Sequence, residues 1–398
     1  MNQSIPTVVI LGAVRYAKDF HSTSLNTAIY LSQRTHVLYI ENPFTVKDQL
    51  RFSVKKAPSN QKGRKSICGV DQCISSDLEI ITPPVVLSTH FLPEGWLYRR
   101  LQDINEWRLV SFIRLQLRRR GITEFVFINS FNFHYPGVGR KLKPLSNIYQ
   151  CVDPLVMDFD SKHGVVSEKI LLNECDAVFC TSSALFEEKR AVNANTHFIP
   201  NAADAAHFRK ATETETPIHE CLQHIDRPIV GYIGTVERRL DYVFLKELFA
   251  SNLDKRFVFV GPVSPEFVPD WFYTQPNVEL ISSKKYVELP SIIKGFDACL
   301  IPFKVDSVSR TIFPLKLFEF LGSGKPVLAT NFNPDLKAYT GSAVDYCGTV
   351  GEMNLALDRA LNNPTAGLAT RLEIANQNTW EQRIEQIIHL ISKSFREK

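Results

Sequence analysis

Long apolar runs and paired cysteines are what this sequence most clearly lacks. Its apolar runs are only a few residues long, as in Val85-Val86-Leu87, whereas a helix needs ~20 such residues to cross a bilayer. Eight cysteines are spread over 398 residues, and no two of them form a C-x-x-C pair. This spacing excludes a disulfide-rich scaffold and offers no zinc motif. We therefore expect a protein of a reducing compartment without a metal site.

The remaining composition is that of a globular protein. Apolar residues make up 44% and charged residues 22% of the chain, close to the average for folded domains. The first apolar run, residues 6–12, has no basic segment before it, so we interpret it as a strand and not as a signal peptide. These features predict a cytoplasmic protein.

Charge is distributed unevenly along the chain. Residues 1–212 hold 26 Lys and Arg against 19 Asp and Glu, a net charge of +7, whereas residues 213–398 hold 20 against 23. The basic first half favours an anionic partner. Basic clusters at 47–65 and 114–120 indicate a membrane surface as one such partner. A pI of 8.5 is too modest to indicate nucleic acid.

Strands and helices alternate along the chain in two series. The first runs from the apolar segment 6–12 to residues 196–204, and the second restarts at 228–235 and continues to about 395. Such alternation predicts parallel sheets with crossover helices. Each series opens with an apolar strand that leads into a glycine, so the fold class that we expect is α/β with two Rossmann-like domains.

We place the domain boundary in the polar, irregular segment 205–227. This gives a first domain of residues 1–212 and a second domain of residues 213–378. Residues 51–77 show little periodicity and are interpreted as a loop or hairpin insertion. Ligands of parallel sheets bind at the carboxyl ends of the strands, so two facing domains would place the site in the cleft between them.

The segment 309–327 is the most informative motif. It is predicted to be a loop, a helix and the next strand, with Pro314 in the first helical turn, where no backbone donor is needed. The free N–H groups of such a turn attract anions. Lys316 and Glu319 are three residues apart and share one helix face, where the Lys could contact a phosphate and the Glu the hydroxyls of a ribose. A solvated Lys–Glu pair on a surface helix is the alternative.

A second motif follows the strand at 228–235. The strand ends at Gly234, where the missing side chain permits close approach of a ligand. In the loop beyond it, Arg238 or Arg239 could clamp a diphosphate. The segment does not match G-x-G-x-x-G, which argues against an NAD or FAD site, and the sequence has neither a Walker A loop nor a G-x-S-x-G elbow.

Together the two motifs resemble the second domain of GT-B-fold glycosyltransferases, in particular the retaining enzymes of family 4. The resemblance lies in the segments YIGTVERRLDYVFLKEL, ELPSIIKGFDACLIPF and FPLKLFEFLGSGKPVLAT, and in ECDAVFCTSSALFEEKR and HFIPNAAD of the first domain. It is good over residues 146–335, weak over 13–35 and absent over 51–77. It implies a GT-B fold whose last helix, residues 379–398, returns to the first domain.

The resemblance implies a nucleoside-diphosphate-sugar donor held by the second domain. Glu319 matches the ribose-binding Glu, Arg238 a diphosphate-binding basic residue, and Gly234 the glycine that faces the diphosphate. The candidate catalytic residues are Arg238, Lys316 and Glu319. The other donor-side candidates are Thr235, Tyr286, Val287, Ser309, Arg310, Thr311, Ile312, Phe313 and Pro314. We expect no cofactor and no metal, because cations and amides can stabilise the leaving diphosphate.

Two positions depart from the family pattern. Many members carry two Glu eight residues apart on this loop and helix, whereas here Thr311 precedes Glu319 at that spacing. The Arg that follows the strand glycine in the family is Thr235 in this chain. A subgroup with a P-x-K-x-x-E pattern resembles this chain better. The sequence therefore does not identify the donor sugar or the groups that bind its hydroxyls.

The acceptor is expected in the first domain, at residues that follow its strands. The candidates are Gly12, Asp19, His134 and Asp153. His134 lies in an aromatic loop, residues 131–136, that could stack on a sugar ring, and an ordinary structural histidine is the alternative. Asp153 precedes Pro154, so its alternative role is to cap a turn.

These observations predict a hexosyltransferase-like glycosyltransferase that transfers a sugar, with retention of configuration, to a glycan, lipid-linked or other acceptor. We expect a role in surface polysaccharide or glycoconjugate biosynthesis, with an anionic membrane surface at the inner face as a further partner and no nucleic acid. A nucleotide-sugar epimerase of the same fold is one alternative. A catalytically inactive GT-B binding protein is another, suggested by Thr235 and Thr311. Turnover of the donor with and without acceptor separates the three.

Overall fold

The chain folds into two compact units, each built on its own sheet. The computed structural model describes residues 5–16, 22–54, 69–156, 160–225 and 228–396. The first unit comprises Met1–Ile199 together with Ile384–Lys398, and the second comprises Pro200–Arg383. The last helix thus belongs to the first unit along most of its length, as the sequence predicts.

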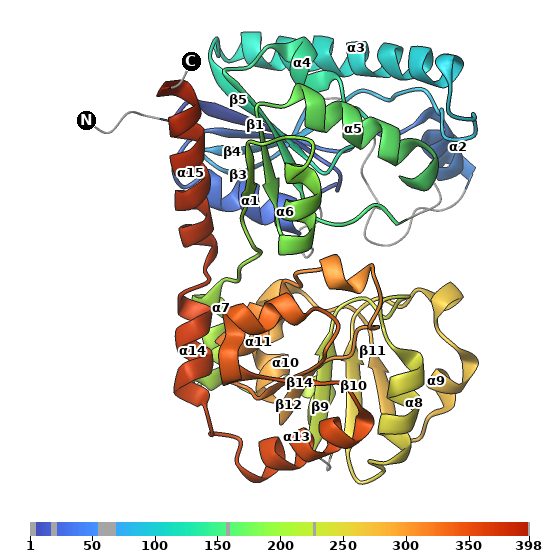
Figure 1. Cartoon of the computed structure of the whole chain (residues 1–398), viewed down its shortest axis with the longest axis vertical. Coiled ribbons are helices and arrows are strands. Elements are labelled where there is room, and N and C mark those ends of the chain that lie inside the picture. The colour runs from blue at the N-terminus through green and yellow to red at the C-terminus, as the bar shows by residue number, and fades with distance from the viewer. Residues whose placement is uncertain (1–4, 17–21, 55–68, 157–159, 226–227, 397–398) are drawn as a thin grey trace. The chain divides into compact units, whose positions relative to one another are not determined.

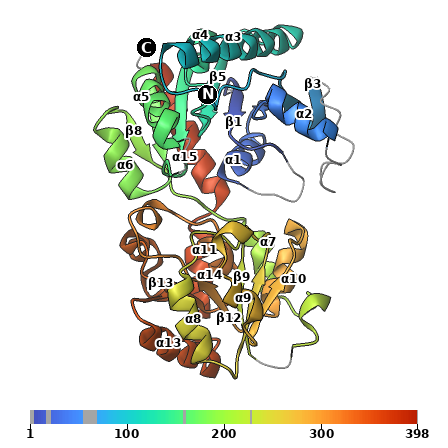
Figure 2. The same ribbon diagram turned by 90° about the vertical axis from the view of Figure 1, so that its right-hand side faces the viewer.

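The first unit is built on an eight-stranded sheet with the order β3-β4-β2-β1-β5-β6-β7-β8. Its strands are β1 (Thr7–Gly12), β2 (Val37–Ile40), β3 (Gly69–Ser75), β4 (Leu78–Thr82), β5 (Phe125–Ser130), β6 (Ser146–Cys151), β7 (Ala177–Cys180) and β8 (Thr196–Phe198). All neighbouring strands are parallel except β3 and β4, which form an antiparallel hairpin. Figure 2 shows β3 and β8 at opposite edges of this sheet.

The predicted insertion at 51–77 is only partly described. Its start lies in helix α2 (Val46–Val54) and its end forms β3, so the hairpin interpretation is confirmed for the described part. Residues 55–68 lie outside the described residues.

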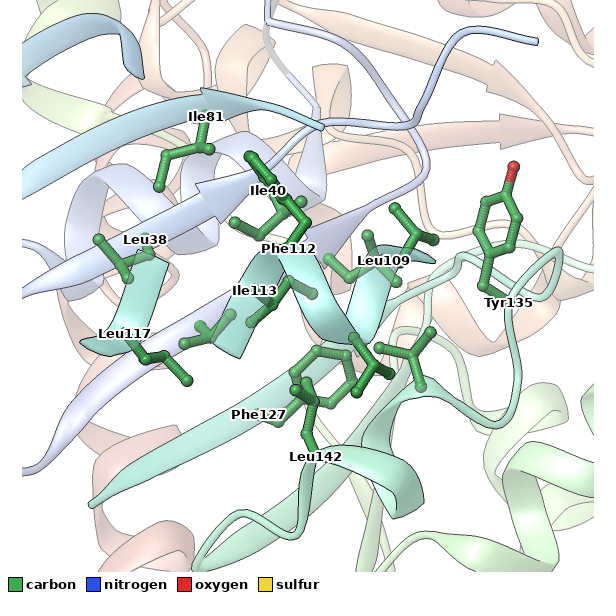
Figure 3. Close-up of a cluster of buried hydrophobic side chains, with 14 of the residues drawn as sticks. Leu38, Ile40, Ile81, Leu109, Phe112, Ile113, Leu117, Phe127, Tyr135 and Leu142 are labelled. Carbon is green, nitrogen blue, oxygen red and sulfur yellow. The ribbon is translucent and has the colours of Figure 1, made fainter. Parts of the chain in front are cut away.

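One hydrophobic core cluster of the first unit lies between the sheet and helix α3 (Trp96–Arg119) (Figure 1). Leu109, Phe112 and Ile113 of that helix pack on strand residues such as Leu38 and Phe127 (Figure 3). The remaining helices of this unit are α1 (Thr23–Leu31), α4 (Val138–Leu142), α5 (Val165–Glu174), α6 (Ser183–Arg190) and most of α15 (Trp380–Arg396).

The second unit is built on a six-stranded parallel sheet with the order β11-β10-β9-β12-β13-β14. Its strands are β9 (Ile229–Ile233), β10 (Arg256–Val260), β11 (Val278–Ile281), β12 (Ala298–Ile301), β13 (Val327–Thr330) and β14 (Val344–Cys347). This is the doubly wound order 3-2-1-4-5-6, in which ligands bind where the strand order reverses. The reversal lies between β9 and β12.

The described part of the second unit holds eight helices. They are α7 (Ala205–Arg209), α8 (Tyr242–Ala250), α9 (Asp270–Thr274), α10 (Leu289–Lys294), α11 (Lys316–Gly322), α12 (Lys337–Thr340), α13 (Val350–Asn362) and α14 (Leu368–Asn376). Helix α14 packs on α11 and was not predicted, because residues 368–376 show only a weak apolar stripe. The short helices α7, α9 and α12 were not predicted either.

The predicted boundary after residue 212 lies too late in the chain. Residues 200–212 pack on the second unit, where α7 contacts α10, α11 and α14. The Arg209 guanidinium donates to the Asn376 side-chain oxygen at 2.6 Å. The polar composition of this stretch suggested a linker, but its apolar side chains, among them Phe208, are buried in the second unit.

Candidate functional site

Gly234 lies directly after β9, at the point where the strand order of the second sheet reverses. Its φ of +138° is a conformation that side-chain-bearing residues rarely adopt. A β-carbon built at this position would lie 2.6 Å from the Lys316 Nζ and 3.2 Å from the Tyr232 hydroxyl. The glycine therefore makes room for the Lys316 ammonium against the end of the strand.

The Lys316 side chain rests on two aromatic rings. Its Nζ lies 3.9 Å from the centre of the Tyr232 ring and 5.0 Å from that of Phe303, a geometry that stabilises a cation. The Tyr232 hydroxyl donates to the Thr235 carbonyl at 3.0 Å, which holds the ring in place. Sequence reasoning missed both aromatic residues, because each one is an ordinary apolar residue in or near a strand.

Lys316 and Glu319 are charged groups held in a low-polarity environment. Burial lowers the pKa of Lys316 to about 7, opposed by Glu319, and Arg239 lowers it further. Burial raises the pKa of Glu319 to about 7, opposed by Lys316. Within the described ranges, neither the ammonium nor the carboxyl group has a hydrogen-bond or ion-pair partner. Groups with perturbed pKa values at a strand-order reversal are candidates for ligand contacts.

The loop before α11 is braced by two buried asparagines. Asn201 donates to the Phe313 carbonyl at 2.6 Å, and Asn333 donates to the Ile312 carbonyl at 3.0 Å. Earlier in the loop, Ser309 N–H donates to Asp306 and the Thr311 hydroxyl donates to the Val308 carbonyl at 2.7 Å. This bracing fixes the approach to Lys316. Arg310 in the same loop is exposed.

The start of α11 differs from the prediction. The helix begins at Lys316, two residues after Pro314, and runs for seven residues. Pro314 instead accepts a hydrogen bond from Leu317 N–H in the turn that leads into the helix. Lys316 and Glu319 lie in the first turn of this helix, and their spacing of three residues gives them the shared helix face that was predicted.

The loop after β9 holds two arginines, and the structure links the second to Lys316. Arg239 forms an ion pair with Glu237 at 3.3 Å, and both residues influence the pKa of Lys316. Arg238, the residue predicted to contact the diphosphate, lies half-buried in the same turn. Arg239, which the sequence offered as the alternative to Arg238, therefore joins the candidate set, and Glu237 is an addition to it.

Tyr286 and Val287 form a short 3₁₀ turn before α10. The Tyr286 ring stacks on His207 with 4.5 Å between the ring centres, and the Tyr286 carbonyl lies 2.9 Å from the His207 Nε2. Val287 is exposed. His207, on α7, was missed by sequence reasoning because it lies in the stretch that was predicted to be a linker.

The first unit has its own strand-order reversal, between β1 and β5. Gly12 ends β1, and a β-carbon there would lie 2.0 Å from the Tyr39 hydroxyl, so close packing requires this glycine. The Gly12 carbonyl accepts from the Asn132 side chain at 2.9 Å. Asn129 and Asn132 are buried. The Asn129 side chain donates a hydrogen bond to the Asn132 carbonyl and accepts one from the Asn132 N–H, which places a rigid turn beside Gly12.

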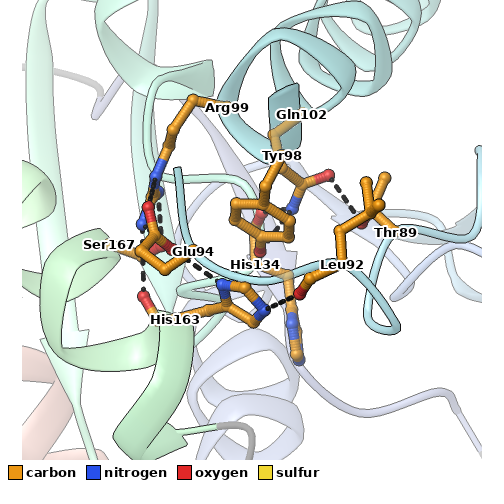
Figure 4. Close-up of polar contacts among 9 residues, drawn as sticks. All are labelled: Thr89, Leu92, Glu94, Tyr98, Arg99, Gln102, His134, His163 and Ser167. Carbon is orange, nitrogen blue, oxygen red and sulfur yellow. Dashed lines mark hydrogen bonds and ion pairs between the residues drawn. The ribbon is translucent and has the colours of Figure 1, made fainter. Parts of the chain in front are cut away.

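His134 follows that turn and is electrically neutral at physiological pH. Burial, together with His90 and His163, lowers the pKa of His134 to about 3. Its carbonyl accepts from Gln102 at 2.7 Å (Figure 4). Phe133 and Tyr135 on either side of it are buried. The aromatic loop therefore packs inward at these two rings, and the predicted stacking of a sugar on them is not supported.

A second polar cluster, which sequence reasoning missed, lies beside His134. Figure 4 shows Glu94 between Arg99 and His163. The Glu94 carboxylate accepts from the Arg99 Nε at 2.6 Å and lies 2.7 Å from the His163 Nδ1. The His163 ring stacks on Tyr98 with 3.8 Å between the ring centres. These residues are scattered over residues 94–163, and no spacing in the sequence links them.

The last two acceptor-side candidates are less well defined. Asp153 is half-buried after β6, and its carbonyl accepts from the Cys151 thiol at 3.8 Å. Asp19 lies outside the described residues.

Within the described parts of the chain, no group of three or more His, Cys, Asp and Glu is arranged to hold a metal ion. None of the described helices is long and apolar enough to cross a membrane.

Comparison with known proteins supports the fold and gives one sequence relative. No protein-family model matches the chain. A Bacillus subtilis (strain 168) protein, TuaH, assigned to teichuronic acid biosynthesis as a glycosyltransferase, is 27% identical over 200 residues. The match covers 46% of this chain and 50% of TuaH, so it spans about half the length of that relative.

The solved structures most relevant to the fold cover nearly the whole chain. Sucrose-phosphate synthase from Thermosynechococcus elongatus has a TM-score of 0.67 at 15% identity, over 99% of this chain and 100% of that one. The UDP-forming trehalose-phosphate synthase of Burkholderia vietnamiensis has a TM-score of 0.69 at 11% identity, over 98% and 99%. HepE from Anabaena, solved with UDP, has a TM-score of 0.64 at 12% identity, over 98% and 100%.

These similarities confirm two predictions. The chain has the GT-B fold, with two Rossmann-like α/β domains. Its resemblance to glycosyltransferases, noted from short motifs, is confirmed by the relative TuaH, which is assigned to that class of enzyme.

Proposed function

We propose that this chain is a glycosyltransferase that transfers a sugar from a nucleoside-diphosphate sugar to an acceptor. The observation that carries the proposal is the placement of Lys316. Its ammonium lies against Gly234 at the strand-order reversal of the second sheet, one helical turn from Glu319. Two ionisable groups that have no hydrogen-bond or ion-pair partner among the described residues suit, at such a position, a ligand that offers both a phosphate and hydroxyls.

The donor is proposed to bind with its diphosphate beside Lys316 and its ribose beside Glu319. A phosphate next to the ammonium would favour the charged form of Lys316, which burial disfavours in the free protein. The Glu319 carboxylate would accept hydrogen bonds from the vicinal hydroxyls of the ribose. The base would lie toward Tyr286 and Val287, and we propose uridine because UDP is the nucleotide in structures of similar fold.

Transfer requires stabilisation of the negative charge that grows on the leaving diphosphate. Lys316 and the arginines of the turn at 237–239 are proposed to supply this stabilisation. Since three basic side chains come from this one region, we propose that catalysis needs no metal. Retention of configuration is part of the proposal, supported by the resemblance to retaining enzymes and by a trehalose-6-phosphate synthase studied for transfer with retention.

The acceptor is proposed to be a glycan or a lipid-linked sugar used in surface polysaccharide biosynthesis. The support is the relative TuaH, which is assigned to teichuronic acid biosynthesis. The acceptor would bind at the β1–β5 reversal of the first unit, beside Gly12 and His134. A neutral His134 ring can donate a hydrogen bond to a sugar hydroxyl or accept one from it. Because the pKa of His134 is lowered, the ring stays neutral and keeps this role across physiological pH.

A thermal-shift screen with UDP-, GDP-, ADP- and TDP-sugars tests the proposal. We expect stabilisation by UDP-sugars that is lost in Lys316→Met and Glu319→Ala. Release of UDP is then measured with and without candidate acceptors. Acceptor-dependent release supports a transferase, whereas isomerisation of the donor without acceptor would indicate an epimerase. Binding without turnover would indicate an inactive binding protein.

A further inference from the structure

Helix α3 presents an unusual surface to solvent. Twelve of its residues are exposed, and they include five large apolar side chains and five arginines but only one acidic residue: Trp96, Leu97, Arg100, Asp103, Ile104, Trp107, Arg108, Ser111, Arg114, Leu115, Arg118 and Arg119. We call these twelve residues the α3 face. Trp96 is 78% exposed and Trp107 is 68% exposed, which is rare for the residue type that has the largest apolar surface.

The apolar content of the α3 face does not follow from the packing of the core. The opposite side of the helix already buries Leu109, Phe112 and Ile113 against the sheet (Figure 3). That buried side also holds Gln102, Asn105, Glu106 and Gln116. The helix thus places polar groups inside and tryptophans outside, the reverse of what stability alone favours. Contiguous exposed apolar surface of this kind marks an interaction site.

The exposed residues are arranged as one stripe along the helix. At 3.6 residues per turn, Trp96, Arg100, Trp107, Arg114 and Arg118 fall within about 40° of one another around the axis. From the first to the last of these the helix rises by roughly 33 Å. Two tryptophans and three arginines therefore lie along a line that a flat surface can contact all at once.

The charge on the α3 face is of one sign. Five arginines against Asp103 give a net charge of +4, and Asp103 is itself within 3.0 Å of the Lys141 ammonium. Arg114 donates to the Lys141 carbonyl at 2.6 Å. Arg100, Arg108, Arg118 and Arg119 form no ion pair with any residue that the structure describes. A face with unneutralised positive charge complements an anionic partner.

Exposed apolar side chains are also present in segments outside the helix. Phe91, in the segment before α3, is 74% exposed, and Val46 and Leu50 of α2 are exposed as well. Backbone and side-chain bonds hold these parts together: Val46 N–H donates to the Val86 carbonyl, and Leu87 N–H donates to Asn105 of α3 at 2.8 Å. These bonds connect α2 to α3 through residues 86 and 87.

We propose that the α3 face docks on an anionic lipid bilayer. Tryptophans favour the interfacial region of a bilayer, where the ring is partly buried and the N–H stays hydrated. Arginines on the same stripe contact the headgroups of anionic lipids. A second copy of the chain is a poorer partner, since a two-fold interface would bring two faces of the same positive charge together.

This surface differs from the one that the sequence suggested. The apolar residues 109, 110, 112, 113 and 117, which lie next to the basic cluster in the sequence, face the core. Arg120 of that cluster is paired with Glu79 at 2.5 Å. The basic residues of the segment 55–65 lie outside the described residues, and the proposal does not depend on them. It is also independent of the proposed transfer reaction.

Vesicle sedimentation tests the proposal with the full-length protein. The vesicles are phosphatidylcholine alone or phosphatidylcholine with phosphatidylglycerol, each at low and high salt. We expect binding to the anionic vesicles that weakens as salt rises. Trp96→Ser with Trp107→Ser should weaken it at least about tenfold, as the loss of two interfacial anchors implies. Arg100→Gln with Arg108→Gln should weaken binding mainly at low salt.

Matched controls come from the second unit. Val243 is 75% exposed on α8 and Leu355 is 62% exposed on α13, and changing both to Ser should leave sedimentation unchanged. Lys210→Gln with Lys337→Gln is the control for charge, because both lysines are exposed. Stabilisation of every variant by a UDP-sugar, as in the wild type, shows that the fold and the donor site are intact, so that failure of either proposal is recognised separately.

Three outcomes would overturn the proposal. They are absence of wild-type binding to anionic vesicles, equal binding to neutral vesicles at all salt concentrations, and unchanged binding of the double tryptophan variant. Light scattering, which measures the mass of the particle in solution, tests whether the α3 face instead binds a second copy of the chain. A wild-type dimer that dissociates in the tryptophan variant, without vesicle binding, would assign the α3 face to a second copy of the chain. Quenching of tryptophan emission by brominated lipids, lost in the double variant, would give direct support.

Discussion

A β-carbon on Gly234 would lie 2.6 Å from the ammonium nitrogen of Lys316. This relationship links the end of β9 to the start of α11, two segments that are more than eighty residues apart in the sequence. It explains why a glycine with positive φ stands where a strand ends, and why the lysine can lie flat on the Tyr232 ring.

The first prediction concerns this contact. Gly234→Ala should displace Lys316 and weaken UDP-sugar binding about tenfold or more, because a phosphate contact is worth roughly 1.5–3 kcal/mol. Gly341→Ala is the matched control, since Gly341 also has positive φ but has no atom within 4 Å of its β-carbon position. Calorimetric titration should show a loss of affinity in the first variant alone. Equal affinities would separate Lys316 from the donor site.

The second prediction is a pH dependence of donor binding. Binding should need a charged Lys316 and a charged Glu319, and both pKa values lie at about 7 in the free protein. Lys316 loses its proton as the pH rises through 7, and Glu319 gains one as the pH falls through 7. The affinity for a UDP-sugar should therefore be highest near neutral pH and fall on either side.

Two variants separate the acid limb from the alkaline limb of the pH dependence of donor binding. Lys316→Met should bind weakly and lose the alkaline limb, and Glu319→Gln should lose the acid limb. Nucleotide sugars are suitable ligands because their diphosphate does not titrate in this range. A wild-type affinity that stays constant from acid to alkaline pH would contradict the role of both groups.

The third prediction is that Lys316 lowers the stability of the free protein. Its folded pKa lies below its unfolded value, so the penalty is complete below pH 7 and vanishes as the pH rises toward 10.5. Lys316→Met should raise the melting temperature, by about 2–4 °C for each kcal/mol regained in a domain of this size. The gain should be larger at pH 6 than at pH 9. A lower melting temperature at pH 6 would show that the ammonium is well solvated.

The fourth prediction separates the two arginines after β9. Arg238→Ala should lower kcat more than it raises KM, because the charge of the leaving diphosphate is greatest in the transition state. Arg239→Ala should instead shift the alkaline limb of donor binding upward in pH, because Arg239 lowers the pKa of Lys316. Steady-state kinetics that show an intact kcat in Arg238→Ala would remove that residue from catalysis.

The sequence predicts the layout of this fold well because alternating strands and helices dictate it. The glycine after β9 and the lysine and glutamate of α11 were found from their spacing, which a helix converts directly into a shared face. Tyr232, Phe303 and His207 could not be found in this way, because their contacts depend on how distant segments pack. The same limit applies to Glu94 and His163, which lie 69 residues apart and meet only in the folded first unit.

The most direct test of the account is the binding of a UDP-sugar to wild-type protein and to Glu319→Ala, measured by titration calorimetry. Glu352→Ala, an exposed glutamate of α13, is the matched control. We predict that the Glu319 variant binds about 1–3 kcal/mol more weakly, the scale for losing hydrogen bonds to a charged group, while the control binds as the wild type does. Unchanged affinity of a folded Glu319→Ala variant would contradict the assignment of α11 to the donor site.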